Sequence, residues 1–335
     1  MPLSDVPLSL LDRAAVRAGS SEAEDLAHVL DRAVRAEALG YHRFWVAEHH
    51  AVPGIAGSAP AVLMAALAAR TQRLRIGSGG IMLPNHQPLV VAEQAATLEA
   101  LHPGRIDLGV GRSVGFTAAV RDALRTGKDA ADRFGDDLAE LLEHLSGTAP
   151  VTARPRNHAA TPVFVLATGA GVEIAARAGL AVVLGGPALF RQGAGSAVPV
   201  LERYRQRFRP SPWWSRPHVL VSANVAVADT RETARELLLP EALALAVSRT
   251  RGEFPPLAPV RPAELDRLPG RTRSLVEDAL ANSVHGTPPE VRARLEQLVA
   301  DTGADELLVT GGAYDLDARA ASDRQLAALF APRRD

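Results

Sequence analysis

Two adjacent histidines that follow a short apolar segment are the first candidates for chemistry. The segment Phe44–Ala47 is predicted to be a strand, and Glu48, His49 and His50 come directly after it. Neighbouring side chains point in opposite directions on an extended backbone, so the two histidines are poorly arranged to bind one metal ion. His49 is the candidate general acid or base, because an imidazole exchanges protons near neutral pH. The alternative is that both histidines are ordinary half-buried polar residues.

A glycine-rich stretch interrupts the strand predicted at residues 74–83. Ser78, Gly79 and Gly80 lie in its middle. Glycine inside a strand marks either a bulge or a place where a ligand approaches the backbone closely. A flat cofactor could therefore lie against these residues; the alternative is a bulge needed to close a barrel. His86, in the following loop, is a candidate substrate-pocket residue or a surface histidine.

Candidates for an anion site lie where the strands predicted at 106–110 and 163–167 end. These candidates are Gly111, Arg112, Ala167, Thr168 and Gly169. An arginine beside glycines suits a phosphate group. The guanidinium donates several hydrogen bonds, and the glycines have no side chains that would cover the backbone. Thr168 precedes a predicted helix, whose first N–H groups also attract anions. If the two strands are neighbours, Arg112 and Thr168 converge on one phosphate; otherwise they are a locally paired arginine and a helix cap.

The elements that must position these residues alternate along the whole chain. Strands are predicted at 8–11, 44–47, 74–83, 106–110, 163–167, 181–184, 218–228 and 306–310. Helices are predicted at 22–39, 59–69, 88–101, 130–145, 172–178, 198–208, 230–247, 289–300 and 318–329. Strands separated by helices indicate a parallel sheet, and eight such units favour a closed (β/α)₈ TIM barrel. We therefore expect one α/β domain over residues 1–335, with insertions and a mobile loop at 252–273.

Composition excludes several classes of function. The 335 residues include no cysteine, which rules out disulfides, thiolate metal sites and cysteine nucleophiles. The 37 basic and 38 acidic residues nearly cancel, so no large field is available to attract nucleic acid. No apolar run reaches the roughly 18 residues of a membrane span. The N-terminus lacks the basic start and long apolar run of a secretory signal. These features predict a cytoplasmic protein without a membrane or nucleic-acid partner, and no metal site is expected.

Four stretches of the sequence, at residues 40–50, 77–88, 101–112 and 283–291, resemble the bacterial luciferase-like flavin monooxygenases. Their order and spacing are similar to those of the family between about residue 36 and residue 314. The resemblance implies a (β/α)₈ barrel that binds reduced FMN at the C-terminal mouth of the barrel.

The resemblance also implies roles for the candidate residues. His49 would lie near the flavin and oxygen, and the flavin ring would pack against a non-prolyl cis peptide between Gly79 and Gly80. Arg112 and Thr168 would bind the phosphate. The remaining cofactor candidates flank these positions: Ser78, Gly111, Ala167 and Gly169. The substrate-pocket candidates are His50, His86 and Gln87.

The function implied is a two-component monooxygenase. A separate flavin reductase would supply reduced FMN, and O₂ would be used to hydroxylate or epoxidise an organic substrate, as in natural-product tailoring. The family also suggests a homodimer formed through helices of the first half. Two alternatives remain open: a deazaflavin-dependent oxidoreductase, and a non-catalytic luciferase-like subunit.

Overall fold

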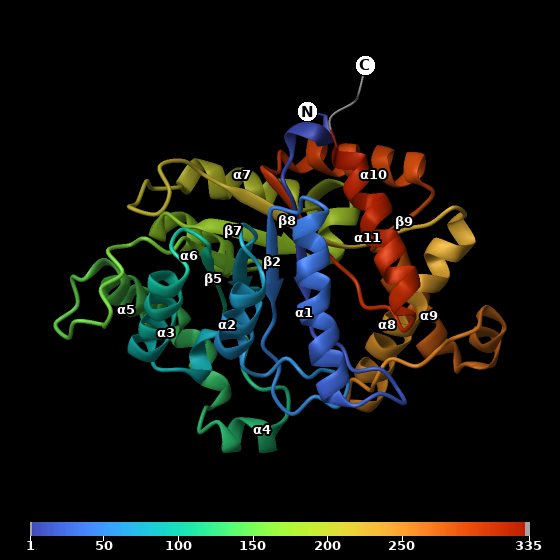
Figure 1. Ribbon diagram of the computed structural model, residues 1–335, viewed down its shortest axis with the longest axis horizontal. Helices are drawn as coiled ribbons and strands as arrows, with labels where there is room; N and C mark the ends of the chain where they lie inside the picture. Colours follow the sequence, from blue (N-terminus) through green and yellow to red (C-terminus); the bar gives the residue numbers. More distant parts are fainter. Residues whose placement is uncertain (1, 332–335) are drawn as a thin grey trace.

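The computed structural model describes residues 2–331, and its main strands form a closed parallel barrel (Figure 1). The barrel strands are β1 (Leu8–Asp12), β2 (Arg43–Val46), β3 (Arg75–Ser78), β5 (Ile106–Gly111), β6 (Val163–Leu166), β7 (Ala181–Gly185), β8 (Val219–Val227) and β10 (Glu306–Thr310). Each strand pairs in parallel with the next, and β10 pairs with both β8 and β1, which closes the barrel. The two shorter strands are β4 (Ile81–Met82), beside β5, and β9 (Val284–Gly286), beside β8. The predicted (β/α)₈ fold is confirmed.

Helices surround the barrel and cover its outer, apolar face (Figure 1). They are α1 (Glu22–Ala38), α2 (Pro60–Arg70), α3 (Pro88–Leu101), α4 (Ala118–Ala123), α5 (Phe134–Ser146), α6 (Ala170–Ala178), α7 (Val198–Arg207), α8 (Arg231–Arg251), α9 (Gly270–Ala281), α10 (Pro288–Thr302) and α11 (Leu316–Phe330). Short 3₁₀ helices occur at Leu3–Asp5, Leu83–Asn85, Lys128–Arg133, Pro187–Phe190, Gly193–Gly195 and Pro262–Arg267. The loop after β5, which carries α4, lies at the lower edge of Figure 1.

The first helix shows how local sequence builds these layers. Ser21 and Glu24 form a capping box, in which the Ser21 N–H donates to the Glu24 carboxylate at 2.8 Å and the Glu24 N–H donates to the Ser21 hydroxyl at 3.2 Å. Val29, Ala33 and Ala36 then recur at helical spacing and are buried. The helix therefore packs one apolar stripe against the barrel and leaves its other faces in water.

An ionic layer closes the N-terminal end of the barrel interior. Arg43 donates to Asp107 at 2.7 Å and to Glu306 at 2.9 Å, and Arg75 donates to the other oxygen of Asp107 at 2.6 Å. Burial raises the pKa of the Glu306 carboxyl, but the Arg43 charge and the hydrogen bonds from His218 and Ser9 together outweigh this and bring the pKa to about 2. Glu306 is therefore ionised at neutral pH, and both carboxylates are paired with buried or half-buried arginines, so this end of the barrel is a packed floor.

An apolar layer lies above that floor, where Trp45 and Phe164 pack edge to face with ring centroids 4.9 Å apart. Glycines in β3 and after it leave space for the side chains of this apolar layer. A Cβ on Gly77 would lie 2.5 Å from the Trp45 indole nitrogen, and a Cβ on Gly79 would lie 2.6 Å from Leu11 Cδ1. Part of the glycine-rich signal in the sequence is therefore explained by packing inside the barrel.

Three element predictions need correction. The strand predicted at 74–83 is broken into β3 and β4, which pair with different parts of β5. The helix predicted at 130–145 begins as α-helix only at Phe134, after a 3₁₀ turn. The predicted loop at 252–273 contains a 3₁₀ helix, and α9 starts within it, at Gly270. Helix α9 lacks the usual start signals, since Pro269 caps it without a side-chain hydrogen bond.

Helices α8 and α9 form a hairpin with a small apolar core of its own, seen at the lower right of Figure 1. Leu238 and Ala242 of α8 pack with Val276 and Leu280 of α9 in a cluster separate from the main core. The α8–α9 hairpin is therefore an added layer that stands on the barrel.

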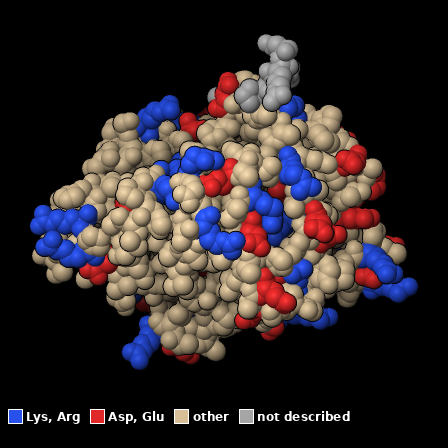
Figure 2. Space-filling view, viewed as in Figure 1, with Lys and Arg blue, Asp and Glu red and all other residues tan. Residues whose placement is uncertain are grey.

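The outer surface carries intermixed charges on the face seen in Figure 2, without a large area of one sign. Within residues 2–331, no helix combines the length and apolarity needed to cross a membrane.

Candidate active site

The ends of β5 and β6 bring the predicted anion-binding residues to neighbouring positions. Gly111 is aligned with Leu166 across the two strands, so Arg112 and Thr168 emerge side by side at the mouth. Both side chains are exposed, and Arg112 has no ion-pair partner in the described part of the chain. Gly169 precedes α6 with a φ of +59°, which favours glycine. The free N–H groups at the start of α6 complete a position suited to an anion.

Gly111 is the candidate glycine that leaves open space at this position. A Cβ placed on it would meet only the Leu166 carbonyl oxygen, at 3.8 Å. A Cβ on Gly80 would instead lie 2.8 Å from Leu166 Cδ1. The bond between Gly79 and Gly80 is a cis peptide, as the family resemblance implied.

Ser78 is directed away from the mouth. Its side chain is fully buried, the hydroxyl donates to the Gly109 carbonyl at 2.8 Å, and the Gly109 N–H donates back to it at 3.0 Å. Ser78 therefore ties β3 to β5, and its hydroxyl is not available to a cofactor. Ala167 is also buried and offers no polar side chain.

His49 lies at the end of β2 with its ring stacked on Phe116, at a centroid distance of 5.9 Å and an interplanar angle of 15°. Its backbone N–H donates to Gly57 at 2.8 Å, and its Nδ1 is buried without a hydrogen-bond partner in the described residues. Burial, assisted by the Arg13 charge, lowers the pKa of His49 to about 4. At neutral pH His49 is therefore an uncharged imidazole whose buried Nδ1 has no hydrogen-bond partner.

Glu48 joins two of the predicted pocket residues into one cluster. Its Oε1 lies 2.5 Å from His50 Nε2 and 2.8 Å from His86 Nε2, and its Oε2 accepts the Met82 N–H at 2.8 Å. Burial raises the pKa of Glu48, but the hydrogen bonds, led by that from His86, lower it below its usual value. The buried carboxylate therefore holds the end of β2 against β4 and the loop after it.

The same cluster places its three donor atoms within 4.8 Å of one another, as a metal site would. No metal site was expected from the sequence. The contacts of 2.5 and 2.8 Å from Glu48 to His50 and His86 are hydrogen-bond distances, so these side chains already satisfy one another. Gln87 lies outside the cluster, as the exposed N-cap residue of α3.

Glu48, Phe116 and Arg13 are site residues to which the sequence analysis gave no role. Glu48 stands beside the two histidines, which is a signal, but its partner His86 is 38 residues further along the chain. Nothing in the sequence around Phe116 indicates that its ring reaches His49. These contacts depend on how loops of different strands meet over the barrel.

A cavity of about 560 Å³ opens in the other half of the mouth, and we call it the mouth cavity. Its base is made by the ends of β1 and β10 and the middle of β8, and its walls by the segment after β7 and by the α8–α9 hairpin. Arg13, Arg191 and Arg249 line it together with apolar side chains. His50, His86 and Gln87 are not among its lining residues.

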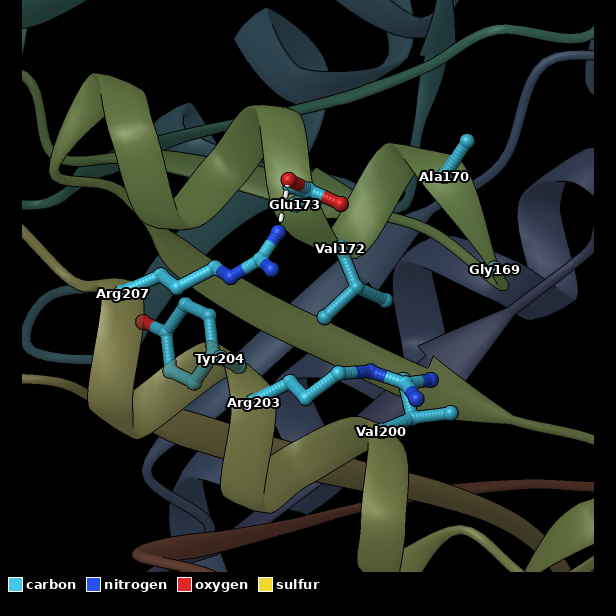
Figure 3. A pocket seen from close by; sticks show the side chains of 8 residues that line it. All are labelled: Gly169, Ala170, Val172, Glu173, Val200, Arg203, Tyr204 and Arg207. Atoms are coloured by element: carbon cyan, nitrogen blue, oxygen red, sulfur yellow. Dashed lines mark hydrogen bonds and ion pairs between the residues drawn. The ribbon is translucent and has the colours of Figure 1, made fainter.

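A smaller pocket of about 280 Å³ lies between α6 and α7 (Figure 3). Gly169 and Ala170 form one end of it, and Glu173 points toward Arg207, with which it forms an ion pair. Because a carboxylate already faces the arginine here, this pocket is a poorer anion site than the end of β5.

Comparison with known proteins gives matches over most of the chain. Residues 6–306 match the family described as luciferase-like monooxygenase. A luciferase-like monooxygenase of Escherichia coli K12 is 38% identical over 324 residues, 94% of each chain. An N-acetyl-S-alkylcysteine monooxygenase of Bacillus subtilis is 45% identical over 150 residues, 44% of this chain and 45% of that protein.

Solved structures show the same fold. The structure of apo-MsnO8 has a TM-score of 0.87 and 33% identity, covering 98% of this chain and 100% of that one. A type II Baeyer–Villiger monooxygenase from Pseudomonas putida in complex with FMN has a TM-score of 0.72 at 17% identity and covers 98% of each chain. An F420-dependent secondary alcohol dehydrogenase has a TM-score of 0.73 at 16% identity, covering 99% of this chain and 100% of that one. The last two similarities concern the fold alone. The match over residues 6–306 shows that the chain belongs to the luciferase-like monooxygenase family.

Proposed function

We propose that the protein is the oxygenating component of a two-component, FMN-dependent monooxygenase that acts on an organic substrate. The observation that carries this proposal is the mouth of the barrel. Exposed Arg112 and the start of α6 lie there at the ends of adjacent strands, and half-buried His49 has a buried Nδ1 without a hydrogen-bond partner at the end of β2. The barrel mouth thus combines an accessible position for an anion with a histidine nitrogen that has no hydrogen-bond partner. This combination fits a phosphate-bearing cofactor.

Different residues of the chain would bind the cofactor, handle the proton and exclude water. Arg112, Thr168 and the N–H groups of α6 hold the phosphate, and Gly111 leaves room beside them. Reduced FMN, when bound, supplies the electrons that activate O₂, so that one oxygen atom enters the substrate and the other leaves as water. The neutral His49 holds or accepts a proton at Nδ1, and the packed floor of the barrel excludes water from below.

A separate flavin reductase is part of the proposal. Support comes from the chain itself, because within residues 2–331 the strands and helices belong to the barrel, its covering helices, the α8–α9 hairpin and short elements of the connecting loops. No second nucleotide-binding domain accompanies the barrel in that range, so the reducing equivalents would arrive as reduced flavin.

The test is an anaerobic titration with photoreduced FMN, followed by admission of O₂. We expect saturable binding, a loss of affinity of about tenfold or more in Arg112→Ala, and no change in Arg70→Ala, whose arginine is exposed on α2. His49→Gln should keep the flavin affinity and change the rate at which O₂ oxidises the bound flavin, followed by flavin absorbance. Absence of measurable flavin binding by the wild type would refute the proposal.

Two other functions are separated by the same titration. Binding of the deazaflavin coenzyme F420 more tightly than FMN would favour a hydride-transfer oxidoreductase, as in the F420-dependent enzyme of similar fold. A wild type and a His49→Gln variant that behave alike in every flavin reaction would favour a non-catalytic subunit.

We also propose that the protein is a homodimer formed through helices of its first half. Support comes from apolar side chains that stay exposed on three of these helices: Val34, Val62, Val90 and Leu101. Val62 of α2 is 72% exposed. Sedimentation should show a dimer for the wild type and a monomer for Val62→Asp; a wild-type monomer at micromolar concentration would contradict the proposal.

A further inference from the structure

We infer that the mouth cavity selects a monoanionic substrate, with a carboxylate bound by arginines and an apolar body packed on the barrel. This inference rests on the proposed function and names the substrate class for the same mouth. It is carried by the charge and the walls of the mouth cavity.

Arg13 is the fixed cation at the base of the mouth cavity. Its Nη2 contacts Glu241 at 2.7 Å, Asn224 at 3.1 Å and Thr310 at 3.3 Å. These contacts orient the guanidinium, and they leave Nε and Nη1 without a partner among the described residues. Glu241 is buried and does not line the cavity. The base therefore holds an oriented guanidinium whose charge is balanced by one carboxylate.

Arg191 and Arg249 stand on two different walls of the mouth cavity. Arg191 follows β7 and Arg249 lies in the last turn of α8. Both are exposed, and neither has an ion-pair partner in the described part of the chain. Two unpaired guanidinium groups facing one space bind a carboxylate well, since each donates charge-assisted hydrogen bonds.

The net charge of the mouth cavity fits a single negative charge on the ligand. Three arginines and one acidic residue, Asp278, line it, and Glu241 neutralises Arg13 from outside the lining. One positive charge therefore remains for a ligand to balance. A neutral ligand would leave that charge unmatched, and a dianion would exceed it.

The rest of the lining is suited to an apolar group. Leu11 is buried at the base, while Phe190 and Leu245 are half-buried on the walls. The volume of about 560 Å³ lies within the usual range for small-molecule sites. A substrate that combines a carboxylate with an apolar body would satisfy both parts of the lining.

The mouth cavity is distinct from the proposed phosphate position. The cavity is built on β1, β7, β8 and β10, whereas Arg112 and Thr168 follow β5 and β6 in the other half of the barrel. Cofactor and substrate would therefore occupy opposite halves of the barrel mouth, and different arginines would bind their anionic groups.

The experiment compares acids with their uncharged amides by calorimetry on the FMN-loaded protein. The probes are octanoate with octanamide, and N-acetyl-S-butylcysteine with its amide. We expect at least one acid to bind about tenfold or more tightly than its amide, because charge-assisted hydrogen bonds are lost in the amide. Arg191→Gln and Arg249→Gln should each weaken the acid about fivefold or more and leave the amide unchanged.

The matched control is Arg251→Gln, since Arg251 is exposed on the same helix and does not line the cavity. It should leave both affinities unchanged, and all three variants should keep the wild-type affinity for FMN. Equal affinity of both acids and their amides would overturn the inference, and so would a loss of FMN affinity in Arg249→Gln, which would assign the cavity to the flavin phosphate. The same titrations are repeated without FMN; selective binding of the acid by a protein that binds no flavin would keep the inference and refute the proposed function.

Discussion

The imidazole of His49 should stay uncharged far below neutral pH, and a titration can test this. Burial, with the Arg13 charge as a second cause, lowers the pKa of His49 from 6.5 to about 4. That difference corresponds to about 3 kcal/mol of added cost for protonating the ring in the folded protein. The proton expected at neutral pH is therefore the single N–H of a neutral imidazole.

The lowered pKa of His49 should make the folded protein less stable as the pH falls. Between about pH 6.5 and pH 4 the unfolded chain binds a proton at His49 and the folded protein does not, so stability falls as the pH falls through this window. In His49→Gln this contribution disappears. From pH 7 to pH 4.5 the wild type should therefore lose about 2 to 3 kcal/mol more of its unfolding free energy than the variant does.

The assay is denaturant unfolding of both proteins at the two pH values, with the His49 ring followed by NMR. His158→Gln, which removes an exposed imidazole, controls for the loss of a histidine as such. Titration of His49 near pH 6.5 would refute the reasoning. Identical pH dependence of wild type and His49→Gln would refute it independently.

Other expected outcomes concern buried charge, glycine packing and the carboxylate cluster. Arg32 donates to two buried aspartates at 2.8 Å, so Arg32→Met should lower the unfolding free energy by about 3 to 5 kcal/mol. Arg70→Met removes a half-exposed pair and should cost under about 1 kcal/mol; equal losses would contradict the burial argument. A Cβ on Gly109 would lie 2.1 Å from a backbone oxygen, so Gly109→Ala should melt at a much lower temperature than Gly111→Ala, whose nearest atom is 3.8 Å away. Glu48→Gln keeps one acceptor oxygen and replaces the other with a donor, so either the Met82 N–H or the two imidazoles lose their acceptor, and the change should cost about 1 to 3 kcal/mol in denaturant unfolding; an unchanged midpoint would show that the cluster is not structural.

The barrel could be predicted because its signal is local and repeated. Each strand needs only a short apolar run, and each helix a stripe such as that of Val29, Ala33 and Ala36. The same alternation that predicts eight strand–helix units also places their C-terminal ends at one mouth. That is why the adjacency of Arg112 and Thr168 at the ends of β5 and β6 followed from the order of the strands.

Side-chain direction was predicted where backbone geometry determines it. His49 and His50 were expected to point apart, and the prediction is confirmed, since His49 stacks on Phe116 while His50 bonds to Glu48. Which partner each side chain meets depends on loops that return from distant parts of the chain. The ring of Phe116 reaches His49 from 67 positions away along the sequence, and no spacing rule covers such a contact.

Glycines were the least predictable part of the site. The sequence could not distinguish glycines required by close packing from those that leave room for a ligand. Gly79 and Gly80 accommodate neighbouring side chains, whereas Gly111 borders open space. The glycines required by packing are recognised only in the structure, where Leu11 lies against Gly79 and Leu166 against Gly80.

The separate core of the α8–α9 hairpin bears on how proteins of this kind can diverge. The hairpin supplies one wall of the mouth cavity, yet its cluster around Leu238 and Val276 is distinct from the main core. Substitutions at Leu245, Arg249 or Asn282 change that wall without repacking the strands beneath it. The barrel and the half of its mouth that carries Arg112 and Thr168 can therefore stay constant while the mouth cavity is altered by mutation in a hairpin that packs around its own core.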